Sequence, residues 1–191
     1  MDFDRFQDIE DRLRMLEGFP RRAYGKFRGV VVDNQNDPAS AGRIQVKVPE
    51  IHGDDAVWAW PCVPYAGDQV GWFVLPPVNA GVWVEFEGGD PGMPIWVGCF
   101  WGDQQLPPDA TTPDNRLLQT EKGLIKFDDA AEEIVIQNDN GSITLNTDVV
   151  TDSGGATHTV GSSGVVSESS PGKVEIGSGG VSVNDGAFKV V

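Results

Sequence analysis

Alternating apolar and polar residues define the segment around which the rest of the chain can be interpreted, residues 25–49. In residues 43–48 every second position is apolar, and arginine, glutamine and lysine fill the positions between them. This period of two indicates a strand with one face on a core and the other in water. The preceding residues 26–33 form a β-branched run, and the turn-rich DNQNDPASAG separates the two segments. The pattern predicts a hairpin with a long tip.

Further short apolar segments follow at close spacing. Residues 57–65 are interrupted by two prolines and are predicted as an irregular or edge strand, and residues 71–75 are predicted as a short strand. Residues 81–87 alternate cleanly, and residues 94–101 close the set. About five principal strands with no helical period between them predict a small closed barrel of the oligonucleotide/oligosaccharide-binding (OB) type.

Apolar residues recur as doublets in the last third of the chain, and turn residues separate the doublets. One series repeats every nine residues and a later one every seven. Such a strand exposes a narrow apolar strip that cannot bury itself alone, and the repeat is short for a single-chain solenoid. Three copies wound into a triangular prism would bury the strips on a common axis. The predicted trimer core comprises Ile125, Phe127, Ile134, Ile136, Ile143, Leu145, Val174, Ile176, Val181, Val183, Phe188 and Val190.

Two segments leave alternatives open. Residues 151–172 are rich in serine, glycine and threonine, and they either continue the prism with a core of small residues or loop out of it. Residues 2–17 are predicted to form an amphipathic helix that ends before Gly18 and Pro20. Its apolar stripe packs on its own subunit or symmetry mates, or docks to a partner protein. The stripe comprises Phe3, Phe6, Ile9, Leu13 and Leu16.

The charge of the chain argues against a nucleic-acid partner. The formal net charge is −15, which repels a phosphate backbone. All six tryptophans lie between residues 58 and 101, and residues 57–102 contain no lysine or arginine. A base-stacking surface would lack the cations that bind the backbone, so these tryptophans are expected to fill a core or a protein interface. Cys62 and Cys99 have apolar neighbours in the sequence and are expected to be buried thiols.

No motif predicts catalysis, and we expect no enzymatic activity. Nucleophile-elbow, zinc-protease and phosphate-loop motifs are absent from the sequence. Adjacent acids such as Asp128 and Asp129 could in principle serve glycoside cleavage, but their turn-rich surroundings favour solvated charges. No metal site and no cofactor are expected. One alternative is His158, because three copies facing a three-fold axis could be axial metal ligands, whereas a solvent-facing ring would bind none.

Two long motifs resemble a known family. They are GVVVDNQNDPASAGRIQV at residues 29–46 and PVNAGVWVEFEGGDPGMPIWVG at residues 77–98. Both are similar to the spike barrel shared by phage baseplate protein V, the central spike of long contractile tails and the VgrG spike of type VI secretion. The later TEKGLIKFDD, at residues 120–129, resembles the entry of that family into a trimeric β-helix.

The resemblance implies an all-β fold with four regions. These are an N-terminal amphipathic helix and linker at residues 1–24, a five-stranded OB barrel at residues 25–102, a linker at residues 103–116, and an intertwined triangular trimeric β-helix at residues 117–191. The implied function is that of a homotrimeric central spike in a contractile-tail baseplate. Such a spike is attached below the tube and hub and leads penetration of the target cell envelope.

The same resemblance implies the partners and the location. The stripe in residues 2–17 would dock to a baseplate hub protein. A separate PAAR-type protein would form the tip, because the chain lacks the terminal His-x-His of some family members. The short linker also leaves no room for the lysozyme domain that other members carry between barrel and β-helix. We expect a virion tail component that is assembled in the host cytoplasm without a signal peptide and contacts the target envelope only during injection. The alternative is a tail adhesin or a polysaccharide-binding or polysaccharide-degrading tail protein.

Overall fold

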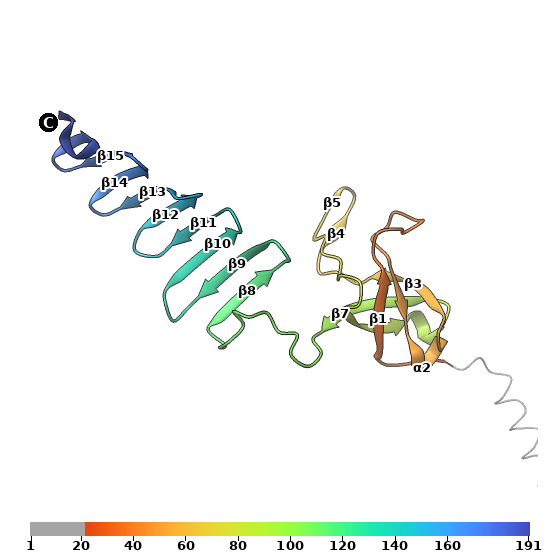
Figure 1. The fold of residues 1–191 in the computed structure, drawn as a ribbon. Helices are drawn as coiled ribbons and strands as arrows, with labels where there is room; N and C mark the ends of the chain where they lie inside the picture. The colour runs from red at the N-terminus through yellow and green to blue at the C-terminus, as the bar shows by residue number, and fades with distance from the viewer. Residues whose placement is uncertain (1–21) are drawn as a thin grey trace, which may run out of the picture. The chain divides into compact units, whose positions relative to one another are not determined.

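The computed structural model describes residues 22–191, so the helix expected at residues 2–17 lies outside the described part of the chain. Contacts divide the chain into two compact units, Met1–Gln105 and Leu106–Val191. The first contains a closed barrel and a small hairpin, and the second contains a single ten-stranded sheet (Figure 1). Nearly all the regular secondary structure of the described residues is β-strand, which confirms the all-β prediction.

The barrel is closed by five strands in the order β1-β2-β3-β7-β6. All neighbours are antiparallel except β3 and β7, which pair in parallel. A short helix, α2 (Pro49–His52), connects β2 to β3, and a 3-10 turn at Glu87–Gly89 connects β6 to β7. The strands are β1 (Phe27–Asp33), β2 (Ile44–Lys47), β3 (Ala56–Pro61), β6 (Gly81–Phe86) and β7 (Pro94–Phe100).

The barrel core follows the alternation seen in the sequence. Ile44 and Val46 of β2 are fully buried, while the residues between them are only partly covered. In β6 every second residue is buried in the same way. The residues with no exposed surface come from β1, β2, β3 and β6 and from the position just after β2, and they pack together inside the barrel, which confirms the predicted closed barrel. They are Val31, Ile44, Val46, Val48, Ala59, Val82 and Val84.

Residues 71–75 do not form the predicted strand. Only Val70–Gly71 is extended and paired, as β5, in a two-stranded hairpin with β4 (Ala66–Gly67). The barrel has no place for a further strand, because β3 pairs directly with β7. Trp72 and Phe73 are therefore left exposed at 56% and 76%.

The two cysteines are also placed differently from the expectation. Cys62 and Cys99 are both free and exposed. Cys99 lies in β7, where side chains alternate between the inside and the outside of the barrel, and Cys62 directly follows the end of β3. Partial burial raises the pKa of the Cys99 thiol.

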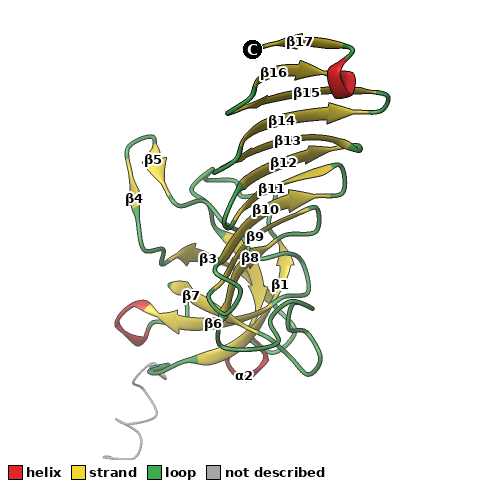
Figure 2. Ribbon diagram, turned by 90° about the vertical axis from the view of Figure 1, so that its left-hand side faces the viewer, coloured by secondary structure: helices red, strands yellow, loops and turns green. Residues whose placement is uncertain are grey.

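The second unit is one antiparallel meander in which each strand pairs with the next (Figure 2). Its first strand begins at Asn115, before the first apolar doublet in the sequence. Short turns join the strands, so the sheet is long in the direction of strand stacking and narrow along the strands. The strands are β8 (Asn115–Gln119), β9 (Gly123–Asp128), β10 (Glu133–Asn138), β11 (Gly141–Leu145), β12 (Val149–Ser153), β13 (Ala156–Gly161), β14 (Gly164–Ser169), β15 (Gly172–Gly177), β16 (Gly180–Val183) and β17 (Phe188–Val190).

Residues 151–172 continue this sheet and do not loop out of it. They contribute most of β12, all of β13 and β14 and the start of β15, each paired in register with its neighbours. The serine, glycine and threonine residues of this segment thus supply both turns and strand positions. Of the two alternatives left by the sequence, the structure favours the continuous one.

The glycine that opens β16 is required by its backbone and its surroundings. Gly180 has φ +100°, and a Cβ there would collide with the backbone carbonyl of Val190, whereas Gly179 has open space around it. We expect Gly180→Ala to destabilise the end of the sheet by about 1–3 kcal/mol, because strain and collision act together. Gly179→Ala is the matched control and should be nearly neutral. Hydrogen exchange of the β16 and β17 amides measures the difference, and equal protection in both variants would contradict it.

Candidate assembly surface

The pairing register of the ten-stranded sheet places two columns of side chains on the same face. We call this face the apolar face. The first column comprises Arg116, Phe127, Ile134, Leu145, Val149, Val160, Val165, Ile176, Val181 and Val190. The second comprises Leu118, Ile125, Ile136, Ile143, Thr151, His158, Ser167, Val174, Val183 and Phe188.

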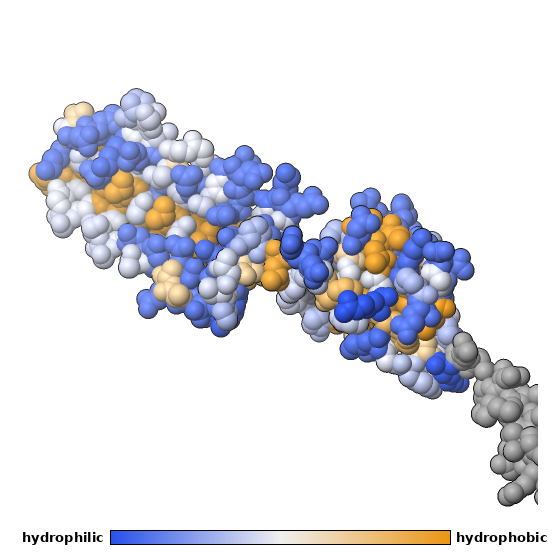
Figure 3. Space-filling model, turned by 60° about the horizontal axis from the view of Figure 1, so that its bottom comes forward, coloured by the Kyte–Doolittle hydropathy of each residue, from blue (hydrophilic) through white to orange (hydrophobic). Residues whose placement is uncertain are grey.

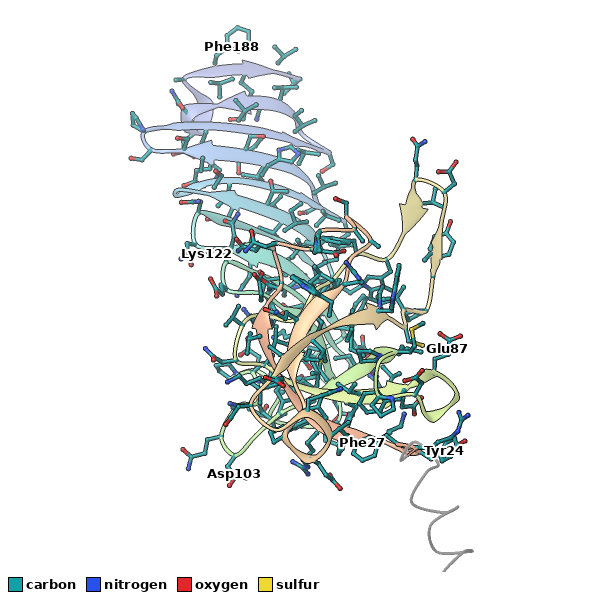
Figure 4. All side chains as sticks on the ribbon, turned by 90° about the vertical axis from the view of Figure 1, so that its right-hand side faces the viewer. Tyr24, Phe27, Glu87, Asp103, Lys122 and Phe188 are labelled. Carbon is teal, nitrogen blue, oxygen red and sulfur yellow. The ribbon has the colours of Figure 1, made fainter. Side chains whose placement is uncertain are left out.

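The apolar face is open in the single chain. Every strongly exposed large hydrophobic residue in strands β8–β17 belongs to it, and Ile136, Ile176 and Phe188 are 46%, 50% and 61% exposed. Orange surface runs along the sheet unit between bluer margins (Figure 3). Phe188 stands at the last strand of this unit (Figure 4). Exposed apolar strips of this extent indicate an interaction surface.

The opposite face of the sheet carries the charges. Lys126 lies within 3.6 Å of Asp128, and Lys173 within 2.7 Å of Glu175. The hydrogen bond from Lys173 to Glu175 raises the pKa of the lysine. The same face also holds Leu124 and Val135, which are buried, whereas Arg116 is the one lysine, arginine or acidic residue in the two columns of the apolar face. Charges thus concentrate on one face of the sheet, as in a sheet that meets water on that side. The charged positions of this face are Lys126, Asp128, Glu133, Asp152, Glu168, Lys173, Glu175 and Lys189.

All twelve residues proposed from the sequence as a trimer core lie on the apolar face, although their burial in a trimer stays a prediction. Four apolar members of this face were not predicted from the sequence, Leu118, Val149, Val160 and Val165. Val149 and Val165 are each followed by a second valine, and adjacent strand residues point to opposite faces. Only the pairing register shows which valine of each pair belongs to the apolar face.

Three polar residues interrupt the second column on neighbouring strands. His158 of β13 pairs in register with Thr151 of β12 on one side and with Ser167 of β14 on the other. The Nδ1 atom of His158 lies 2.7 Å from the Ser167 hydroxyl. The Thr151 hydroxyl donates a long hydrogen bond of 3.4 Å to the His158 carbonyl. We call Thr151, His158 and Ser167 the polar belt.

The tip of the β1–β2 hairpin is organised by one carboxylate. Asp37 accepts hydrogen bonds from the backbone N–H groups of Ala39, Ala41 and Arg43 and from Nε of Arg43. The side chains of Asp37 and Arg43 are only 10% and 17% exposed. Partial desolvation raises the pKa of Asp37, but these hydrogen bonds outweigh it and hold that pKa well below its ordinary range.

This carboxylate should make barrel stability dependent on pH. Because the folded pKa is depressed, the stabilisation is complete above the ordinary aspartate pKa of about 3.9 and is lost as pH falls through the folded pKa. We expect Asp37→Asn to lower the thermal midpoint of the barrel at neutral pH and to affect it less in strong acid. The exposed Asp54→Asn is the control. Tryptophan fluorescence reports the midpoint, and a pH-independent difference would contradict the assignment.

The six tryptophans are divided between core and surface. Trp96 is buried at 5% exposure, whereas Trp60, Trp72 and Trp101 are exposed. Arg43 lies over Trp60, with 5.2 Å from its guanidinium carbon to the ring centroid. The tryptophans thus do not all fill the core, and the exposed ones leave apolar surface on the first unit.

The remaining candidate residues lie elsewhere or form no site. Phe3, Phe6, Ile9, Leu13 and Leu16, which the sequence suggests for hub docking, lie outside the described residues. Within residues 22–191 no group of three or more histidine, cysteine or acidic side chains could hold a metal ion in a single chain. In the same range, no helix has the length and apolar character needed to cross a membrane.

Comparison with known families identifies the barrel. Residues 27–101 match the family model described as the type VI secretion system/phage-baseplate injector OB domain. The closed five-stranded barrel fits an OB fold, and the match spans all five barrel strands. No curated protein matches the chain. The match indicates a spike-type protein of a phage baseplate or related injector.

Proposed function

We propose, starting from the match of the barrel to the injector OB domain, that the protein is the homotrimeric central spike of a contractile-tail baseplate. In this role it is attached below the tube and hub and leads penetration of the target cell envelope. The proposal rests most directly on the apolar face, which leaves two mainly apolar columns of side chains uncovered in the single chain. A mechanical role also fits a chain in which no catalytic motif is found.

The shape of the apolar face favours three copies over two. The apolar side chains of this face lie in only two columns, so the apolar strip is narrow, about 7 Å from one column to the next. Two such strips packed face to face, about 10 Å apart, would leave both long sides open to water. Three strips around an axis cover one another's sides, and the charged faces then point outward. This arrangement is the one that the resemblance to a triangular trimeric β-helix implies.

In this role the two ends of the chain would bind partner proteins. A hub protein would bind residues 1–24, and a separate PAAR-type protein would cover the end beyond Phe188 and Val190, where the apolar columns stop. We assign no enzymatic activity and no cofactor to the chain. The assembled protein would belong to the virion tail baseplate.

Localisation on the parent particle tests this function. Antibodies against the barrel should label one site at the distal end of the tail tube in electron micrographs of particles that carry the protein. The rival function, a tail adhesin or polysaccharide-degrading protein, requires label on fibres and binding or cleavage of host polysaccharide. Label on fibres, with depolymerisation by the purified chain, would replace the spike with that rival.

A further inference from the structure

The polar belt is the one break in the apolar face. Of the twenty positions in the two columns, seventeen are not part of it, and these are aliphatic or phenylalanine except for Arg116 on the first strand. The three belt residues are consecutive in one column, on β12, β13 and β14. Val149, Val160 and Val165 lie beside them in the other column.

The hydrogen bonding of the belt leaves one ring atom free. Nδ1 of His158 is held by the Ser167 hydroxyl at 2.7 Å. The structure describes no hydrogen bond from Nε2 to residues 22–191. In the tautomer with the proton on Nδ1, Ser167 accepts that proton's hydrogen bond and Nε2 carries a free lone pair. A hydrogen bond at the far nitrogen is how metal-binding histidines are oriented.

In a trimer, burial of the free Nε2 atom of His158 would cost free energy. Three copies of Nε2 would enter an interior that is apolar on either side of the belt, and an unpartnered polar atom there costs free energy. The column positions around the belt carry no carboxylate and no lysine. The His158 ring therefore has neither a salt-bridge partner nor a competing positive charge among them. Neutral imidazole nitrogens suit zinc, nickel, copper and cobalt, and three of them leave a coordination position for water.

We propose that the three His158 rings of the trimer together bind one divalent transition-metal ion on the trimer axis, between the three apolar faces, each ring oriented by the Ser167 hydroxyl of its own chain. The site deepens the proposed function and depends on the trimer, because one chain supplies a single ligand. It revises the expectation of no metal, since the register places His158 on the apolar face and not among the charged residues. The ion would fix the three chains in the same axial position.

Metal content and oligomeric state are measured together on the full chain. After dialysis against Zn²⁺ and removal of excess ion, elemental analysis should find one zinc per three chains. In the His158→Val variant the new side chain is the same as those of the neighbouring valines, so this variant should stay trimeric and lose the ion. His52 is unchanged in this variant, so zinc bound by the other histidine of the chain would remain. Ser167→Ala should stay trimeric and bind zinc about 10- to 100-fold more weakly.

Each other outcome is decisive. A wild-type trimer without zinc, or with zinc that His158→Val retains, overturns the site and leaves the spike intact. A trimer that holds only water or an anion at His158 also overturns it. A monomer overturns the spike and the site together. A chelator should lower the thermal midpoint of the wild type and leave that of His158→Val unchanged, and equal shifts would contradict the proposal.

Discussion

Ile136→Asp is expected to abolish trimerisation and to leave the barrel folded. Ile136 lies in the second column of the apolar face and is 46% exposed in the single chain. In the trimer the substitution would place three carboxylates in an apolar interior, and each uncompensated buried charge costs several kcal/mol. Size-exclusion elution at micromolar concentration measures the loss. Because all six tryptophans lie in the barrel unit, their emission checks that this unit stays folded.

Gln137→Asp is the matched control for this experiment. Gln137 is the next residue of β10, so its side chain points to the opposite, charged face. Each variant adds one negative charge, and only the face differs. Gln137→Asp should elute as the wild type does. If both variants remained trimeric, the apolar face would not be the interface. If both lost the trimer, added charge alone would explain the effect.

Val31→Ala is expected to destabilise the barrel by about 2 kcal/mol, whereas Val30→Ala should change its stability little. Val31 has no exposed surface, and removing two of its carbons loses their transfer free energy and leaves a cavity. Val30 is its neighbour in β1 and is 42% exposed. Both variants lose the same β-branched side chain, so the comparison isolates burial.

Urea denaturation followed by tryptophan emission measures this difference. Trp96 lies in the same core cluster as Val31 and reports its loss directly. Protein concentration has to be equal in all samples, since association contributes to apparent stability. Equal midpoints for the two variants would show that β1 does not face the core as described.

The barrel could be predicted from the sequence because its core obeys strict alternation. Ile44, Val46 and Val48 occupy every second position, and each is fully buried. The prediction of a strand at residues 71–75 was wrong for a different reason. Their apolar character marks a segment that lies outside the barrel, and hydrophobicity alone does not indicate which strand closes a barrel. Here β3 pairs with β7 directly, a contact between strands distant in sequence.

The apolar face was predicted where doublets repeat and missed where they do not. Ile134 and Ile136 are separated by one residue, and this spacing marks the same face of a strand. In residues 151–172 the apolar residues are fewer and are partly adjacent, so the sequence does not define their face. The same ambiguity concealed the orientation of His158. Pairing from β12 to β14 resolves both, because a register assigns every residue of a strand to one face.

The mass of the purified full-length chain in solution, measured by native mass spectrometry, tests the central claim most directly. The claim is that the apolar face of the ten-stranded sheet is covered by two further copies of itself. The account predicts a single species with three times the 20.6 kDa mass of one chain. A monomer would contradict it by leaving the apolar face in water, and a dimer would contradict it by covering that face with one copy instead of two.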